Sequence, residues 1–342
     1  MIGIVMFFTA LFMLLIGFPV AFTFAAVSVL FGVLAGVLEI YGDGGFDVSF
    51  IQGLSEGWIT GVEMFDYMPF RIYSIQQSTI LMAIPMFIFM GIVLQKTGLA
   101  EKLLESMGFL FGEIRGGVAI STVLVGSLLA ASTGVVGASV VAMGVISLPV
   151  MLKYKYNTEL ATGTICASGT LGQIIPPSIV LVLLGDVISS AYQQAQLEMG
   201  VFAPETISVG DLFAGAILPG LLLVILYLIY ISVTAWLSPD KMPKPDITER
   251  QQTGFYWRVA KSLLPPFMLM LAVLGSIIGG LATPTEAASV GAVGALLLAI
   301  ISKQLSKDTL QKVMRDTTRI TSMVFMILIG AALFSLVFRG FE

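Results

Sequence analysis

The sequence predicts an all-α polytopic membrane protein that contains an inverted repeat, a re-entrant helical hairpin and a discontinuous helix. Of its 342 residues, 57% are hydrophobic and 11% are charged, against roughly 25% charged residues in an average soluble domain. Apolar stretches of about 20 residues, the length that crosses a bilayer, recur from one end of the chain to the other. Lipid must therefore surround most of this chain.

The residue inventory excludes several kinds of chemistry. There is no histidine and one cysteine, Cys166, so neither a disulfide framework nor a Cys/His metal site can form. No Walker loop, G-x-S-x-G elbow or H-E-x-x-H string is present. We therefore expect no catalytic residues, no transition metal, no cofactor other than a coupling ion, no ATP-driven pump and no nucleic-acid partner.

Residues 1–38 carry no charge, and Gly17-Phe18-Pro19 interrupts them midway. This pattern predicts two short spans joined by a tight turn; the alternative is one long kinked helix. The absence of a basic start and of a small-residue cleavage site argues against a removable signal peptide. Residues 39–79 hold six acids against the single base Arg71, which suits the outer face.

Basic residues then fix the sides of the membrane. A span at about 79–95 leads into an amphipathic stretch, 96–115, that we expect in the interface. The apolar block 116–152 is too long for one ordinary span and has basic residues on both flanks. It therefore predicts a re-entrant hairpin whose tip lies near residues 132–137.

The next crossing, from Thr158 to about residue 188, is broken by Gly169-Thr170-Leu171-Gly172-Gln173 and Pro176-Pro177. An acidic outer segment, an inward span and a basic connector follow at 189–211, 212–236 and 240–261. Spans at 263–282 and 284–302, a basic amphipathic stretch to Arg319 and a last span to Phe338 complete the pattern. On this topology every Lys and Arg except Arg71 and Arg339 faces the cytoplasm.

An internal repeat connects the two ends of the chain. Gly17-Phe18-Pro19 resembles Ala282-Thr283-Pro284, and FIFMG at 87–91 parallels MILIG at 326–330. The first copy starts outside and the second inside, which is the inverted architecture of many secondary transporters. The second copy stops at Glu342 before its own hairpin, so we expect a truncated chain; a naturally short protein is the alternative.

Two stretches place non-helical backbone inside the membrane, where it survives only if it is buried in protein or lines a cavity. Both the hairpin tip, 131–139, and the interrupted segment, 167–178, are rich in Gly, Ser and Thr. Unwound carbonyls and hydroxyls suit Na⁺, while opposed amino termini of half-helices favour an anion. We therefore expect coupled binding of Na⁺ and a carboxylate; the alternative is that small residues serve only close helix packing.

Outside these stretches, two acids are expected at helix starts. Glu286 follows Thr283-Pro284-Thr285, and Glu159 follows Asn157-Thr158. Each is predicted to cap a helix amino terminus, where the helix dipole favours a carboxylate.

Three strings carry a family resemblance: AIPMFIFMG at 83–91, ASGTLGQIIPPSIVLVLLG at 167–185 and ATPTEAASVGAVGAL at 282–296. Together they closely resemble the large membrane (permease) subunit of tripartite ATP-independent periplasmic (TRAP) transporters. The resemblance implies a multi-pass protein of the bacterial inner membrane that uses a Na⁺ gradient and moves a transport domain against a scaffold, elevator fashion. It also implies a small four-helix membrane subunit, a periplasmic substrate-binding protein and a small organic-acid substrate.

Carried over by position, the resemblance implies a first Na⁺ site made from both stretches. Its residues are Ser132, Thr133 and Gly134 at the hairpin tip and Ser168, Gly169 and Thr170 in the broken helix. The residues that would shape this site and the substrate cavity are Gly172, Gln173, Pro176, Pro177 and Ser178. The family commonly has proline where Gln173 stands, and the region expected to hold a second Na⁺ site is absent.

The expected organisation has four parts. Residues 1–115 supply scaffold helices, an outer segment and an interfacial helix, and 116–188 supply the transport-domain hairpin and broken helix. Residues 189–262 form an outer loop, a linking span and a cytoplasmic connector, and 263–342 begin the second repeat, which we expect to be incomplete. Within the outer segment 42–78, Trp58, Phe65 and Tyr67 are a candidate contact for the binding protein, and a plain interfacial loop is the alternative.

The leading hypothesis is a Na⁺-coupled symporter subunit for carboxylate-bearing metabolites. A one-component Na⁺/dicarboxylate carrier is the alternative within transport. A scaffold or assembly role for a truncated protein and, more remotely, an intramembrane enzyme are alternatives from other classes. No Lys or Arg lies mid-membrane, so the sequence does not identify the residue that grips a substrate carboxylate.

Overall fold

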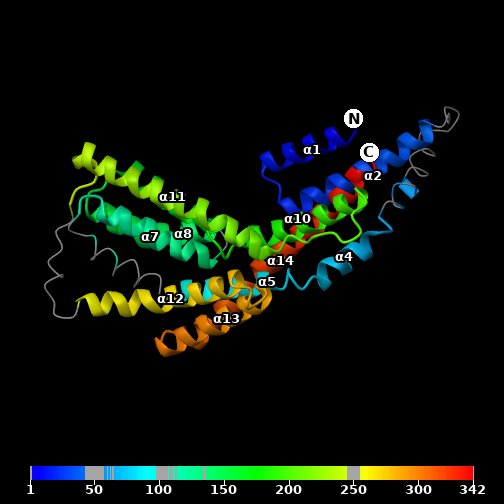
Figure 1. The fold of residues 1–342 in the computed structure, drawn as a ribbon. Helices are drawn as coiled ribbons and strands as arrows, with labels where there is room; N and C mark the ends of the chain where they lie inside the picture. The colour runs from blue at the N-terminus through cyan, green and yellow to red at the C-terminus, as the bar shows by residue number, and fades with distance from the viewer. Residues whose placement is uncertain are drawn as a thin grey trace. The chain divides into compact units, whose positions relative to one another are not determined.

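A computed structural model describes residues 2–42, 58–59, 61, 63, 65–97, 107, 111, 114–133, 136–244 and 255–341 (Figure 1). These residues are mostly helical and contain no β-strand, which confirms the all-α prediction. Among them, four helices are long and apolar enough to cross a membrane: Val20–Leu38, Val209–Leu237, Pro284–Ile301 and Lys307–Arg339. The described residues are those of a polytopic membrane protein.

The chain divides into two compact units. The first comprises Met1–Ser78 and Arg319–Glu342, and the second comprises Thr79–Thr318. Each unit has its own cluster of buried apolar side chains.

The first unit starts with two helices, α1 (Ile2–Ile16) and α2 (Val20–Gly42). Gly17 between them has a φ of +104°, a left-handed conformation that glycine adopts without steric cost. Pro19 has no N–H with which to continue the first helix. The prediction of a tight turn in residues 1–38 is therefore confirmed, and the alternative of one long kinked helix is wrong.

The core of the first unit joins α1 and α2 to the last part of α14 (Lys307–Arg339). Its buried side chains are Met6, Ala10, Val27, Phe31 and Val337. Gly330 on α14 lies so close to α2 that a Cβ there would be 2.5 Å from the carbonyl oxygen of Ala21. A small residue is thus what allows these two helices to touch, as in other small-residue helix contacts.

The predicted outer segment is described only in part, because residues 43–57, 60, 62 and 64 lie outside the description. The described part contains helix α4 (Met68–Gln77). Trp58 and Tyr67 are exposed, whereas Phe65 packs against the core of the first unit. Two of the three aromatic residues proposed as a partner contact are therefore accessible in this unit.

The second unit contains the remaining helices. They are α5 (Ala83–Lys96), α7 (Gly117–Thr133), α8 (Val136–Lys153), α9 (Thr158–Thr170), α10 (Ile179–Glu198), α11 (Val209–Leu237), α12 (Phe255–Ile278) and α13 (Pro284–Ile301), with two 3₁₀ turns, η1 (Leu171–Gln173) and η2 (Pro239–Lys241).

Helices α5 and α13 share the most extensive helix–helix contact among the described residues of the second unit. Gly291 on α13 lies where an added Cβ would be 2.7 Å from Sδ of Met90 on α5. The hydroxyl of Thr285 donates to the carbonyl oxygen of Thr79 at 2.7 Å, which ties the start of α13 to the segment before α5. A small residue again sets the distance between the helices.

Both predicted caps lie in this unit. At the start of α13, the Thr283 hydroxyl accepts from the Glu286 N–H and the Glu286 carboxylate accepts from the Thr283 N–H, a capping box. The predicted role of Glu286 is thus confirmed. At the start of α9 the cap is Asn157, whose side chain accepts from the Leu160 N–H at 3.1 Å, so the prediction that Glu159 caps α9 is wrong. Glu159 is in the first turn.

Two helices are longer than the sequence pattern suggested. The basic amphipathic stretch and the last span form a single helix, α14, of 33 residues. Helix α10 continues past residue 188 to Glu198, because no breaker occurs before Gly200, whose φ is +80°. The amphipathic stretch 96–115 lies largely outside the described residues.

Candidate functional site

Helices α7 and α8 pack side by side as a helical hairpin (Figure 1). Both outer ends of this hairpin reach the carboxyl end of α11. A Cβ at Gly116, just before α7, would lie 3.1 Å from Cβ of Ala235 and 3.6 Å from Sδ of Met242. The Asn157 N–H, just after α8, donates to the carbonyl oxygen of Lys241 at 2.9 Å. The chain therefore enters and leaves the hairpin at one end of the unit, and the re-entrant placement of this hairpin in the membrane stays a prediction.

Tyr156 joins the two outer ends of the hairpin. It is 3% exposed, and its ring lies in the turn between α8 and α9. Its hydroxyl faces the backbone of Val118 and Ala119 in the first turn of α7, and burial raises the pKa of Tyr156 to about 12. Because desolvation disfavours the phenolate, this side chain stays neutral and packs as part of the core.

The predicted discontinuous helix is present. Helix α9 ends at Thr170, the 3₁₀ turn η1 follows, and α10 does not begin until Ile179. Pro176 and Pro177 lack backbone N–H groups, so they cannot extend a helix through this point. Ser178 then caps α10, where its hydroxyl accepts from the Leu181 N–H at 3.4 Å.

The interrupted segment satisfies part of its backbone internally. The N–H groups of Ile174 and Ile175 both donate to the Leu171 carbonyl oxygen, at 3.0 and 2.9 Å. The Ser178 hydroxyl donates to the carbonyl oxygen of Gln173 at 2.8 Å. Backbone polar groups inside a membrane protein need partners within the protein. These bonds supply some of those partners and hold the break in one shape.

The hairpin encloses the end of α9. Gly126 on α7 lies where a Cβ would be 2.6 Å from Cβ of Ser168, and Gly169 lies where a Cβ would be 2.5 Å from Cγ2 of Val140 on α8. Ser168 and Gly169 are buried, whereas Thr170 is exposed. The structure thus places two of the predicted ion-site residues between the two hairpin helices.

The two predicted site hydroxyls of the broken helix, those of Ser168 and Thr170, bond to carbonyl oxygens of their own helix. The Ser168 hydroxyl donates to the Ile165 carbonyl oxygen at 3.0 Å, and the Thr170 hydroxyl donates to that of Ala167 at 2.8 Å. Each hydroxyl oxygen keeps lone pairs with which it can accept or bind a cation. The local chemistry therefore suits a neutral oxygen cage.

The hairpin tip is the part of the predicted site that the structure does not describe in full. Ser132 and Thr133 are the last residues of α7, but their side chains lie outside the description, as does Gly134 altogether. The meeting of these three residues with Ser168, Gly169 and Thr170 stays a prediction.

The remaining predicted residues line the break itself. Gly172, Pro176, Pro177 and Ser178 are buried, and Gln173 is half-buried. The break also packs against α11, since a Cβ at Gly220 would lie 3.0 Å from Cγ1 of Ile175. Sequence reasoning missed Gly126, Val140 and Gly220 as neighbours of the break, because nothing in a linear pattern shows which helices will pack together.

A family model described as "Tripartite ATP-independent periplasmic transporter, DctM component" matches residues 6–341. This chain belongs to the DctM family. The DctM resemblance inferred from three short strings is thereby confirmed over nearly the whole chain.

Several curated DctM-type proteins are similar to the chain. The C4-dicarboxylate TRAP transporter large permease protein DctM of Pseudomonas aeruginosa is 32% identical over 78% of this chain and 57% of its own length. The ectoine/5-hydroxyectoine TRAP transporter large permease protein UehC of Ruegeria pomeroyi is 28% identical over 96% of this chain and 67% of its own length. The isethionate TRAP transporter permease protein DctMQ of Oleidesulfovibrio alaskensis is 29% identical over 79% of this chain and 39% of its own length.

These DctM relatives are transporter permeases and not enzymes, and the chain is a large-permease member of their family. The chain spans about half the length of the C4-dicarboxylate permeases that it matches.

Proposed function

We propose that the chain is the permease subunit of a Na⁺-coupled, elevator-type secondary transporter of the bacterial inner membrane. It imports small carboxylate-bearing organic anions that a periplasmic binding protein delivers, and it works with a small four-helix membrane subunit. The P. aeruginosa relative is named for C4-dicarboxylates, which are substrates of this chemical class.

One observation carries the ion-coupling part of the proposal: an unwound, uncharged segment of backbone is buried against a helical hairpin. Ser168 is fully buried beside Gly126 of the hairpin, and the break that follows contains no charged side chain between residues 167 and 178. Carbonyl and hydroxyl oxygens are the ligands that hard cations such as Na⁺ prefer, and discontinuous helices are where secondary transporters bind ions.

Helix packing supports the inverted repeat. The strings FIFMG and MILIG, which the repeat equates, lie on α5 and α14. In the second unit α5 packs on α13 through Met90 and Gly291, and in the first unit α14 packs on α2 through Gly330 and Ala21. Each helix thus touches the helix that follows the Pro turn of the opposite repeat.

The test is uptake by proteoliposomes that contain the chain, its small membrane subunit and its binding protein. We expect uptake of a labelled C4-dicarboxylate to require an inward Na⁺ gradient, and to stop when K⁺ replaces Na⁺ or the binding protein is omitted. Uptake that proceeds with K⁺ alone would contradict Na⁺ coupling. Uptake with Na⁺ but without the binding protein would instead support a one-component carrier.

A binding measurement complements uptake, because it needs the purified chain alone. We expect Na⁺ to raise the thermal unfolding midpoint relative to K⁺ at equal ionic strength, since a ligand that binds only the folded state stabilises it. Equal midpoints in the two salts would count against a Na⁺ site in this chain.

A further inference from the structure

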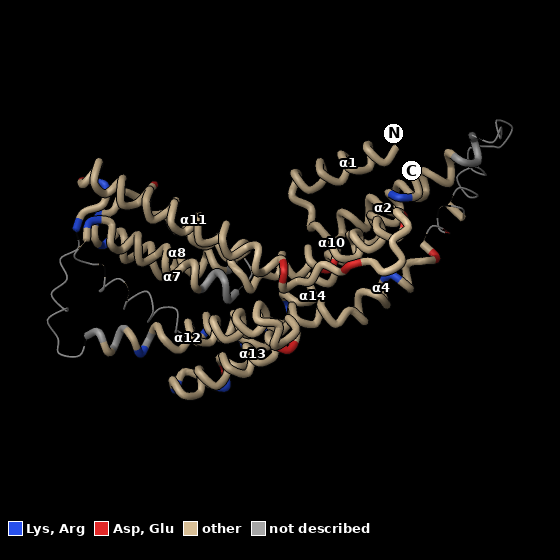
Figure 2. The backbone as a smooth tube through the Cα atoms, viewed as in Figure 1, with Lys and Arg blue, Asp and Glu red and all other residues tan. Residues whose placement is uncertain are grey.

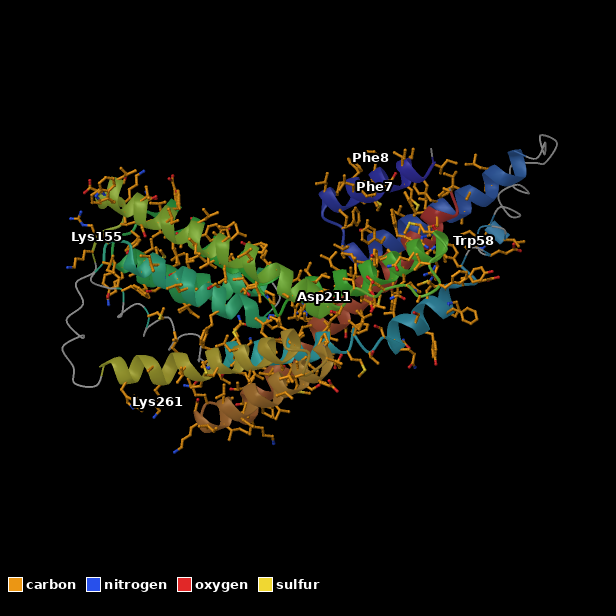
Figure 3. All side chains as sticks on the ribbon, in the orientation of Figure 1. Phe7, Phe8, Trp58, Lys155, Asp211 and Lys261 are labelled. Atoms are coloured by element: carbon orange, nitrogen blue, oxygen red, sulfur yellow. The ribbon has the colours of Figure 1, made fainter. Side chains whose placement is uncertain are left out.

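Basic residues from three separate segments lie at the base of the hairpin, where α7 starts and α8 and α11 end (Figure 2). We call this group the basal cluster. Its members are Arg115, Lys153, Lys155, Lys241 and Lys244, all of which are exposed. Figure 3 shows Lys155 at this end of the second unit.

The contacts that close the hairpin also assemble the basal cluster. The bond from the Asn157 N–H to the Lys241 carbonyl oxygen, 2.9 Å long, brings the α8–α9 turn to the end of α11. Gly116 packs against Met242, which brings Arg115 to the same place. The cluster is therefore a product of the tertiary fold.

Among the described residues of the segments that form the basal cluster, bases outnumber acids. In the described segments that supply it, 114–117, 152–159 and 238–244, the acidic residues are Asp240 and Glu159. The ion pair found among the described residues joins Lys96 to Asp316. Neither residue belongs to the basal cluster. Lys153 Nζ lies 5.9 Å from the centre of the Tyr154 ring, a weak contact that leaves its charge available.

Exposed apolar side chains surround the cluster. Trp236 is 79% exposed and Leu237 is 66% exposed at the end of α11, and Leu152 is 45% exposed at the end of α8. Tryptophan beside lysine and arginine at helix ends is typical of the boundary between lipid headgroups and acyl chains. This end of the unit therefore has the composition of a membrane interface.

An apolar cavity of about 440 Å³ lies between α7, α9 and α11 in the same unit. It is lined by Val123, Leu160, Ala167, Tyr227 and Ile231, and Glu159 is part of its wall. Ile231 also contacts the Gly116 position, so the cavity begins at the base of the hairpin. Its volume is in the range of small-molecule sites, about 300–1,000 Å³.

We propose that the basal cluster binds an anionic phospholipid of the adjoining leaflet. The lysine and arginine side chains hold the phosphate of the headgroup, and one acyl chain lies in the cavity beside α9. A lipid fits better than a free anion because basic groups, the exposed Trp236 and an apolar cavity that begins beside Gly116 lie toward the same end of the unit. The proposal depends on membrane placement and not on Na⁺ coupling or on the transported substrate.

The test uses Trp236 as a reporter of its nearest lipids. In a Trp58→Phe/Trp257→Phe background Trp236 is the remaining tryptophan, because the chain has three. The protein is reconstituted in vesicles of phosphatidylcholine in which a fixed fraction is replaced by brominated phosphatidylglycerol or by brominated phosphatidylcholine. We expect brominated phosphatidylglycerol to quench Trp236 with an apparent affinity at least about fivefold higher, the effect of roughly one basic side chain near an anionic surface.

Two triple variants separate the basal cluster from general charge. In Lys153→Gln/Lys155→Gln/Lys241→Gln the preference should disappear, whereas Lys261→Gln/Lys307→Gln/Lys312→Gln, which removes equal charge elsewhere, should keep it. Equal quenching by both lipids in the unsubstituted cluster, or equal loss in both variants, would overturn the proposal. Displacement of the brominated lipid by excess inorganic phosphate would indicate a free-anion site and would also overturn it.

Gly163 tests the place of the acyl chain. It lines the cavity, and a Cβ added there meets nothing within 4 Å, so Gly163→Leu places an apolar side chain at the cavity with no clash at its Cβ. We expect a severalfold weaker preference for phosphatidylglycerol in this variant. An unchanged preference would overturn the assignment of the acyl chain to this cavity.

Discussion

Gly126 on α7 lies directly against Ser168 on α9: a Cβ added to the glycine would be 2.6 Å from Cβ of the serine and 2.8 Å from its hydroxyl oxygen. Both residues lie in a packed interior, where one added methyl group is enough to change the packing. Because Gly126 has no side chain, α7 can approach Ser168 on α9 this closely.

Replacing Gly126 by alanine should separate these helices. We expect Gly126→Ala to destabilise the protein by about 1–3 kcal/mol, the usual cost of overpacking a core, seen as a lower thermal midpoint. Gly144→Ala on α8 is the matched control, because a Cβ at Gly144 meets nothing within 4 Å; it should be neutral or slightly stabilising. Equal stability of Gly126→Ala and Gly144→Ala would contradict the prediction that this contact limits the distance between the helices.

Removal of the hydroxyls at the break should weaken the response to Na⁺ more than it weakens folding. We expect Ser168→Ala and Thr170→Ala to need at least about tenfold more Na⁺ for half-maximal stabilisation, which corresponds to about 1.4 kcal/mol. Thr162→Ala is the control for Thr170→Ala, because the Thr162 hydroxyl is also exposed and also bonds to its own helix, at 2.9 Å. Unchanged Na⁺ titrations in both break variants would remove these residues from the site.

Loss of the cap on α13 should destabilise the start of that helix. Thr283→Ala removes the hydroxyl that accepts from the Glu286 N–H, and we expect a loss of about 1 kcal/mol. Thr283→Ser keeps the hydroxyl and should keep most of the stability. Circular dichroism during thermal unfolding measures both variants, and equal midpoints for alanine and serine would contradict the capping role.

The raised pKa of Tyr156 predicts a loss of stability in strongly alkaline solution. Since the pKa rises from 10.0 to about 12 on folding, the stabilisation is complete below pH 10 and is lost as the pH rises from 10 towards 12. Phenolate absorbance near 295 nm should show one group that titrates near pH 12 in the intact protein and is missing in Tyr156→Phe. A difference spectrum with its midpoint near pH 10 would contradict the buried state.

Local breakers made much of the fold predictable. Gly17 with Pro19 and the pair Pro176-Pro177 remove hydrogen bonds that a helix needs, so the sequence alone located the turn between α1 and α2 and the break between α9 and α10. Glu286 follows Thr283 at the spacing of a capping box. Each of these features depends on residues a few positions apart.

Features that depend on distant residues could not be predicted. Neither Gly126 nor Ser168 reveals its partner, because many small residues occur in this chain and only tertiary packing selects among them. The hydrogen bond between Asn157 and Lys241 joins a backbone N–H to a backbone carbonyl oxygen. Such groups occur all along every chain, so no side-chain pattern marks this contact. The extent of α14 was also missed, since a change from polar to apolar composition does not by itself end a helix.

The hydrogen bond from Thr285 to Thr79 joins residues 206 positions apart, and this separation bears on how the protein is made. Helix α5 leaves the ribosome long before α13, the helix of the second unit with which it makes its most extensive contact. Until α13 has been inserted, the surface of α5 that later meets Gly291 must contact lipid or other earlier helices. The second unit is therefore completed late in biosynthesis, and a ribosome that stalls before residue 284 leaves it without the contact between α5 and α13.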